Sequence, residues 1–179
     1  MERVNAPTYS TLLAEIDLRP ADALLEIGFG TGAFLRLAAD RLQQGFLAGV
    51  DPSPLMLKMT KKKLQQTKIA FEVRLGDDQN LDWTEHKFDH VVALHSFQFW
   101  HDPASTLDRI SYLLKPNGDL WLCLRNHEDN PPDWLPNPIS RSRHEVSETL
   151  DLLKRLGFQA VQRVANNQKL DLLHARGAG

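Results

Sequence analysis

The chain alternates between short apolar runs and stretches in which apolar residues recur at helical spacing. This alternation predicts βαβ units on a largely parallel sheet. Strands are expected over residues 23–28, 46–50, 69–75, 88–95 and 119–124, and two further short strands over 158–164 and 170–174. Asn166 and Asn167 lie between the last two runs and predict that these pair as a hairpin.

Periodicity and capping residues predict helices between the strands. A short helix around residues 8–16 precedes the first strand. Pro54 suits the first turn of the helix after the second strand, and Asp102 is placed to cap a later helix that residues 115–118 stop. Residues 142–145 form a capping box for a last helix.

The predicted fold class is therefore α/β, a doubly wound, mostly parallel seven-stranded sheet that ends in an antiparallel hairpin. A chain of 179 residues is expected to form one domain, here residues 1–179. Within it, residues 1–20 are a short N-terminal helical segment, and residues 126–141 are a proline-rich loop on the expected substrate side.

Composition narrows the class of protein. The 21 Lys and Arg residues against 23 Asp and Glu residues give a net charge of −2. A protein whose main ligand is nucleic acid usually carries an excess of positive charge, which this chain lacks. Cys123 is the single cysteine, so an internal disulfide is excluded. The first residues lack a secretory signal pattern, and no apolar run is long enough to cross a membrane. We expect a cytoplasmic protein that binds neither nucleic acid nor membrane.

A glycine-rich motif, Glu26-Ile27-Gly28-Phe29-Gly30-Thr31-Gly32, follows the first predicted strand and opens a helix. Glycine allows positive φ in a tight turn and leaves the backbone open to a ligand, while the helix offers unpaired amides. With Ala33 the motif also fits the dinucleotide pattern, so by itself it does not separate nicotinamide cofactors from other adenosine ligands.

Carboxylates at the next two strand ends sharpen the prediction. Asp51 ends the second strand, where a carboxylate accepts hydrogen bonds from both ribose hydroxyls of a nucleoside. Asp77 and Asp78 follow the third strand, where a carboxylate and backbone amides can read an adenine edge. Three successive strand ends therefore predict one adenosine site.

At this point the sequence resembles the class I S-adenosylmethionine-dependent methyltransferases, in the small-molecule branch, from about residue 21 to residue 176. Besides the glycine motif, the matching pieces are Gly49-Val50-Asp51-Pro52-Ser53 with Met56, Gly76-Asp77-Asp78 followed by Leu81, Phe88-Asp89-His90-Val91-Val92, and Leu113-Leu114-Lys115-Pro116-Asn117-Gly118-Asp119-Leu120. The resemblance implies a Rossmann-like methyltransferase fold with S-adenosylmethionine as the cofactor.

The resemblance also implies roles for single residues. Glu26 anchors the methionine end of the cofactor, with Gly28 and Gly30 lining it. Asp51 holds the ribose, and Asp77 reads the adenine amino group. Pro52 and Met56 flank the adenine. The other residues expected to bind the cofactor are Gly32, Ser53, Gly76, Asp78 and His95. Asp78 departs from the family pattern, which usually has a small residue there.

The expected reaction is in-line displacement of a methyl group, in which positioning and exclusion of water supply most of the rate. A general base matters only if the acceptor arrives protonated. His95, at the end of the fourth strand, is the first candidate, although a histidine that lines the pocket or binds a loop fits equally; His101 and His127 are weaker candidates. Phe97, Trp100 and Trp134 are expected to wall a substrate pocket, with ordinary core packing an equal alternative for Phe97 and Trp100.

Alternatives remain open at this stage. A nicotinamide-dependent oxidoreductase fits the glycine motif alone, and a non-catalytic module that binds the cofactor or a partner protein fits the absence of a compelling base. No metal site is expected, because His86, His90 and Cys123 are not grouped as ligands. Residues 61–63, three lysines, are expected to be a solvated helix face. The acceptor is expected to be a small molecule, and both monomer and homodimer fit the sequence.

Overall fold

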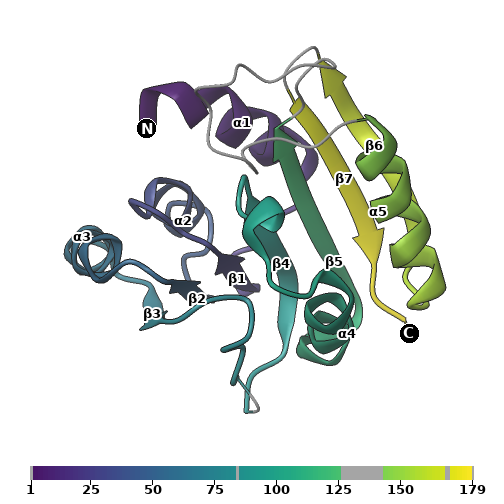
Figure 1. Ribbon diagram of the computed structural model, residues 1–179. Coiled ribbons are helices and arrows are strands. Elements are labelled where there is room, and N and C mark those ends of the chain that lie inside the picture. The colour runs from purple at the N-terminus through teal and green to yellow at the C-terminus, as the bar shows by residue number, and fades with distance from the viewer. Residues whose placement is uncertain (1, 84, 126–142, 168–169, 179) are drawn as a thin grey trace.

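The computed structural model describes residues 2–83, 85–125, 143–167 and 170–178. Its elements in chain order are α1 (Glu2–Glu15), β1 (Ala23–Ile27), α2 (Ala33–Ala39), β2 (Phe46–Asp51), α3 (Pro54–Leu64), β3 (Ala70–Leu75), β4 (Phe88–Leu94), the short 3-10 helix η1 (Phe97–Phe99), α4 (Pro103–Leu113), β5 (Leu114–Arg125), α5 (Arg143–Arg155), β6 (Gln159–Asn167) and β7 (Leu170–Arg176). Figure 1 shows these elements along the chain.

The strands form one seven-stranded sheet in the order β3-β2-β1-β4-β5-β7-β6. The first five strands pair in parallel, whereas β7 pairs antiparallel with both β5 and β6. This arrangement confirms the predicted α/β class and the C-terminal hairpin. Because β1 lies between β2 and β4, the strand order reverses beside β1, and in open α/β sheets ligands bind at the carboxyl ends of strands at such a point.

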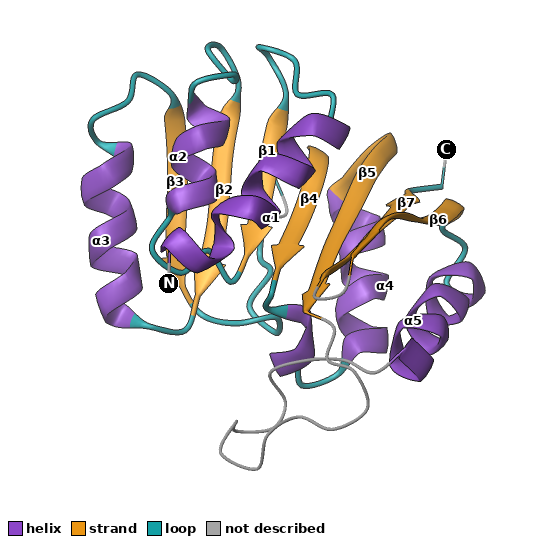
Figure 2. Ribbon diagram, turned by 90° about the horizontal axis from the view of Figure 1, so that it is seen from above, coloured by secondary structure: helices purple, strands orange, loops and turns teal. Residues whose placement is uncertain are grey.

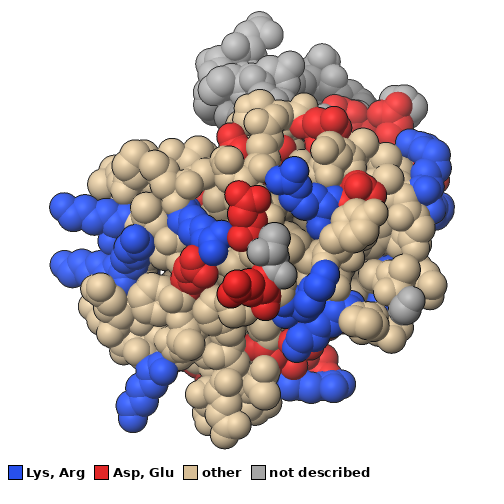
Figure 3. Space-filling view, turned by 90° about the horizontal axis from the view of Figure 1, so that it is seen from below, with Lys and Arg blue, Asp and Glu red and all other residues tan. Residues whose placement is uncertain are grey.

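Helices cover both faces of the sheet. In Figure 2, α1, α2 and α3 lie in front of the sheet, while α4 and α5 lie behind it. Neighbouring side chains of a strand point to opposite faces, so Leu24 packs in the core under α1 and α2, and Leu25 packs in the core on the α4 side. Acidic and basic side chains are interspersed on the face seen in Figure 3.

Two element boundaries differ from the sequence predictions. Helix α1 begins at Glu2 and includes Pro7, whose carbonyl accepts hydrogen bonds from the Ser10 and Thr11 hydroxyls. Strand β5 begins at Leu114 instead of residue 119, because Leu114 already pairs with Phe88 of β4. A register shift before the next pair absorbs the proline and glycine that suggested a loop.

Two other predictions concern helix starts. Asp102 caps α4 as predicted, since its carboxylate accepts hydrogen bonds from the amides of Ala104 and Ser105. The predicted capping serine of α5, Ser142, lies outside the described residues. No helix in the described ranges is long and apolar enough to cross a bilayer.

Candidate functional site

The glycine turn after β1 has an open backbone. Gly28 has φ of 80° and Gly30 has φ of 52°, and residues with a side chain rarely adopt such values. The Gly28 amide donates to the carbonyl of Val50 at 2.8 Å, which ties the turn to β2. A Cβ atom on Gly28 would collide with the side chain of Ser96, whose hydroxyl donates to the Ile27 carbonyl. Glycine at this position therefore lets the β1 turn and the loop after β4 approach closely.

Glu26 is buried beneath this turn, with 2% of its surface exposed. Its Oε2 atom has no hydrogen-bond partner among the described residues. Burial, and secondly the charge of Asp51, raise the pKa of Glu26 well above its usual range, although the backbone amide of Leu35 opposes the rise. A buried carboxyl with an unused acceptor is costly, and a cationic or hydrogen-bonding ligand would offset that cost.

Asp51 is held rigidly at the end of β2. One of its carboxylate oxygens accepts from the Gly30 amide at 2.7 Å, and the other accepts from the Ser53 amide at 2.9 Å. Each oxygen can accept a further hydrogen bond, because an ionised carboxylate offers about four acceptor positions. Ser53 then caps α3 by accepting from the Met56 amide at 3.4 Å. The carboxylate of Asp51 is thus oriented in advance for a donor such as a sugar hydroxyl.

The two aspartates after β3 differ from each other. Asp77 accepts from the Gln79 amide at 2.9 Å, and its side chain is 34% exposed. Asp78 is buried, and its carboxylate binds the Thr106 hydroxyl and the ring and amide of His101. Asp77 therefore keeps an exposed carboxylate, while the oxygens of Asp78 are largely taken up by the protein itself.

His95 follows β4 with φ of 57°, in the left-handed region. Its Nε2 atom lies 2.8 Å from the hydroxyl of Thr8, a buried residue of α1, and its carbonyl accepts from the Gln98 side chain at 2.9 Å. The N-terminal helix thus reaches the carboxyl ends of the strands and fixes the ring of His95. Thr8 is a contact that sequence reasoning missed, since it lies 87 residues away along the chain.

A pocket of about 300 Å³ lies at the carboxyl ends of β1, β2, β3 and β4. Its walls comprise Ile27, Gly28, Asp51, Pro52, Asp77, Asp78, His95, Ser96, Phe99, Trp100 and His101. Seven residues proposed from the sequence as binding or pocket residues are brought together in this wall: Gly28, Asp51, Pro52, Asp77, Asp78, His95 and Trp100. The ends of β1, β2 and β3, which the sequence predicts to form one adenosine site, all contribute residues to this wall.

The other proposed site residues lie outside the wall. Glu26, Gly30, Gly32, Ser53, Met56 and Gly76 lie in or beside the strand-end segments that build the pocket but do not form its wall. Phe97 is 3% exposed and packs in the core, with its ring centroid 4.9 Å from that of Trp100. Trp134 and His127 lie outside the described residues.

The sequence reasoning missed Ser96 and Phe99 as wall residues. Both belong to the segment between β4 and α4. Phe99 is 55% exposed, which is unusual for phenylalanine, and its position between two buried residues gave no sign of this.

Comparison with known proteins places this geometry in context. Residues 25–122 match the model of a family described as a methyltransferase domain. Nocamycin O-methyltransferase from Saccharothrix syringae is 32% identical over 135 residues, which cover 74% of this chain and 48% of that protein. This chain therefore spans about half the length of that relative.

Solved structures share the fold. A S-adenosylmethionine-dependent methyltransferase from Aquifex aeolicus superposes with a TM-score of 0.77 at 19% identity, covering 94% of this chain and 88% of that one. A chain from the complex between the Haloferax volcanii Trm112 methyltransferase activator and a putative methyltransferase superposes with a TM-score of 0.82 at 21% identity, covering 100% and 92%. At these identities the similarity establishes the architecture alone.

Proposed function

Since this chain belongs to the family of methyltransferase domains, we propose that it transfers a methyl group from S-adenosylmethionine to a small-molecule acceptor by in-line displacement. The observation that carries the proposal is the convergence of the Gly28 turn, Asp51 and Asp77 on one pocket. The family match and the solved relative named for this cofactor support S-adenosylmethionine over a dinucleotide.

The residues present fit this cofactor. Asp51, which two backbone amides orient, would accept hydrogen bonds from the ribose hydroxyls. Pro52 and Asp77 lie on the same wall and would hold the adenine, the latter through its partly exposed carboxylate. Glu26 lies below the turn with an oxygen that has no partner in the described structure, and it would stabilise the cationic end of the cofactor. A positive charge on the bound cofactor would favour the ionised form of the Glu26 carboxyl and so oppose the effect of burial on its pKa.

When bound, S-adenosylmethionine supplies a methyl group on a positively charged sulfur, and the sulfur leaves as a neutral thioether. Phe99 and Trp100 in the pocket wall would shield that methyl group from water and hold the acceptor beside it. His95 is the proposed acceptor of the proton when the nucleophile is a hydroxyl, and Thr8 orients its ring. Similarity to nocamycin O-methyltransferase, whose name denotes transfer to oxygen, supports an oxygen atom as the acceptor.

Calorimetry with S-adenosylmethionine and S-adenosylhomocysteine tests cofactor binding directly. We expect both to bind, and the absence of heat or of a thermal shift with either at millimolar concentration would contradict the proposal. Lys62→Ala, on the exposed side of α3, is the matched control and should bind like the wild type.

Methyl transfer needs a separate measurement, because a fold can be shared by proteins with different activities. Formation of S-adenosylhomocysteine is measured with hydroxylated small molecules and, in parallel, with protein and RNA acceptors. Turnover with a small hydroxylated acceptor supports the proposal. Turnover restricted to protein or RNA would move the acceptor to another class while leaving the cofactor site intact.

A further inference from the structure

The loop after β3 is joined to the segment before α4 by the buried carboxylate of Asp78. Its Oδ2 atom accepts from the Thr106 hydroxyl at 2.9 Å and from the His101 amide at 3.1 Å. Its Oδ1 atom lies 3.0 Å from Nδ1 of His101. Asp78 is 3% exposed, and burying a carboxyl group to this extent is costly unless such partners satisfy its oxygens. Asp78 therefore acts as a link between two segments that both line the pocket.

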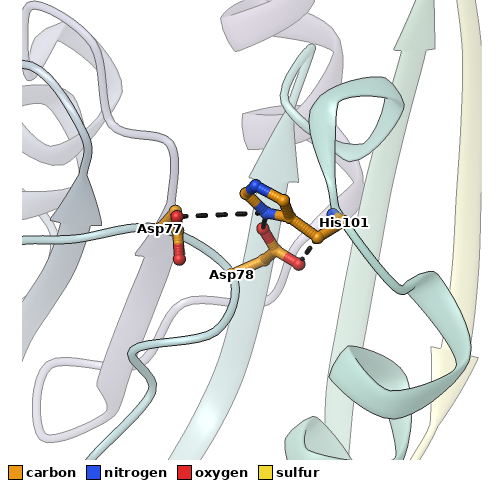
Figure 4. Close-up of side chains that lie close together, drawn as sticks. All are labelled: Asp77, Asp78 and His101. Carbon is orange, nitrogen blue, oxygen red and sulfur yellow. Dashed lines mark hydrogen bonds and ion pairs between the residues drawn. The ribbon is translucent and has the colours of Figure 1, made fainter.

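The imidazole of His101 lies between two carboxylates, as Figure 4 shows. Besides its contact with Asp78, its Nδ1 atom is 3.9 Å from Oδ2 of Asp77. The ring side chain is 57% exposed, so protons reach it freely. One of its two carboxylate neighbours, Asp77, is the proposed adenine contact.

Other groups around His101 are accounted for. Arg109 of α4 donates to the Gln79 carbonyl at 2.8 Å and so ties the same loop to the same helix. Asp102, the next residue along the chain, directs its carboxylate to the first amides of α4. Among the described residues, the charged groups that contact the His101 ring are thus the two carboxylates after β3.

We propose that protonated His101 clamps the loop carrying Asp77 against the segment before α4, positions Asp77 for the cofactor, and thereby makes cofactor affinity depend on pH. This inference rests on the proposed function. It also gives a role to the aspartate at position 78, where the family pattern has a small residue, because its carboxylate contacts both Thr106 and His101.

The direction of the pH effect follows from the charges. The hydrogen bond that His101 donates to Asp78, then the charge of Asp78 and, to a lesser extent, that of Asp77 raise the pKa of His101 above its usual 6.5, and together they outweigh the opposing effect of burial. A histidine with a raised pKa makes its ion pairs below that pKa and loses them as the pH rises through it. The ion pairs of the clamp are therefore present below the raised pKa of His101 and are lost as the pH rises through it.

The test is calorimetry with S-adenosylhomocysteine between about pH 6 and pH 8.5, with EDTA present. Wild-type affinity should fall by about fivefold as the pH rises, as expected for the loss of one partly exposed ion pair. His101→Gln keeps a polar side chain but cannot become charged, so its affinity should be weak throughout and lack this fall. Comparison with that variant cancels any titration of the ligand itself.

A control and an independent readout accompany this measurement. His86→Gln alters an exposed histidine that stacks on Phe46 with ring centroids 4.7 Å apart, and it should keep the wild-type pH profile. NMR titration of the His101 ring in the protein without cofactor should give a midpoint above its usual 6.5. A midpoint at or below that value would contradict the clamp whatever the binding data show.

The remaining outcomes separate the two proposals. Binding that is insensitive to pH, or that falls equally in His101→Gln, overturns the clamp and leaves the proposed function standing. A fall seen only without EDTA would assign the effect to a divalent cation, since the ligand atoms of Asp77, Asp78 and His101 lie within 4.8 Å of one another, and it also overturns the clamp. Failure to bind at every pH overturns both proposals.

Discussion

Carboxylates and histidines gather at both ends of the sheet, around pockets of about 300 Å³ at the carboxyl ends and 420 Å³ at the amino ends. At the amino ends they pair with each other: His174 Nε2 lies 2.7 Å from Asp119, and His90 Nε2 lies 3.2 Å from Asp22. At the carboxyl ends, Glu26 keeps an oxygen with no partner in the described structure. A histidine–carboxylate pair also forms at the carboxyl ends, where His101 contacts Asp78, but the Glu26 carboxyl there remains available to a ligand.

The pKa values of two carboxyl groups, Asp119 at the amino ends and Glu26 at the carboxyl ends, shift in opposite directions. Burial acts against ionisation of Asp119, but the hydrogen bond and charge of His174, with the charges of His90 and Arg176, outweigh it and hold the pKa of Asp119 below its ordinary value. For Glu26, burial is not compensated and the pKa is raised. A paired carboxylate stabilises the fold, whereas an uncompensated one costs stability that a ligand can recover.

The largest effect is expected from strain in the glycine turn. Gly28→Ala should lower the free energy of unfolding by about 3 kcal/mol. The new Cβ atom would collide with Ser96, and the alanine would also have to adopt the positive φ of this position. Gly30→Ala is the matched variant, with positive φ but no atom within 4 Å of the new Cβ, and should cost about 1 kcal/mol. Denaturant unfolding without cofactor measures both, and equal losses would show that the close approach to Ser96 contributes nothing.

A pair of aspartates tests the two ends against each other. Asp51→Ala should weaken S-adenosylhomocysteine binding by about 30-fold, the loss of hydrogen bonds to a charged acceptor. Asp119→Ala should leave that affinity within about twofold but lower the free energy of unfolding by about 2 kcal/mol, since it leaves His174 and Arg176 without their partner. Calorimetry and denaturant unfolding on both variants check this, and a binding loss in Asp119→Ala would abolish the distinction.

The pH dependence of stability should have opposite signs at the two ends. A raised pKa means that the folded state holds its proton more tightly, so the contribution of Glu26 falls as the pH rises above 4.5, its ordinary value. Glu26→Gln should therefore increase the free energy of unfolding of the cofactor-free protein at neutral pH by about 1 kcal/mol. The same variant should bind S-adenosylmethionine more weakly, since the charge facing the cofactor is gone.

Asp119 supplies the opposite slope. Its lowered pKa stabilises the fold above the ordinary value of 3.8, and this contribution is lost as the pH falls through the lowered pKa. Asp119→Asn should flatten the acid side of the stability curve, whereas Glu26→Gln should flatten the side above 4.5. Thermal unfolding across pH measures both slopes, and a decrease of neutral-pH stability in Glu26→Gln would refute the assignment of Glu26 as an uncompensated carboxyl.

The smallest effect concerns the contact between α1 and the pocket. Thr8→Val keeps the shape of the side chain and removes the hydrogen bond to His95, so unfolding should become easier by about 0.5–1 kcal/mol. Cofactor affinity should stay within about twofold of the wild type. Methyl transfer should fall more than cofactor affinity if Thr8 orients the ring of His95, and equal changes in both would assign Thr8 a structural role alone.

Much of the site was predictable because its parts are local. The Gly28 turn, Asp51 and Asp77 each follow a strand whose apolar run is evident, and parallel strands bring their carboxyl ends to one edge. The domain limits, the roles of the site residues and the cytoplasmic location stay predictions. The start of β5 at Leu114 was missed, since a bulge that absorbs Pro116 and Gly118 depends on the partner strand β4.

The sequence by itself determined the succession of strands and helices along the chain, the cap at Asp102 and the position of the glycine turn. Periodicity and turn chemistry act between residues close together in the chain. Only the tertiary structure decided that Thr8 holds His95 and that Asp78 links Thr106 to His101. Thr8 and His95 lie 87 residues apart in the sequence, and Asp78 and Thr106 lie 28 residues apart. A polar side chain gives no local sign of which distant donor will reach it, since that depends on how helices α1 and α4 pack on the sheet.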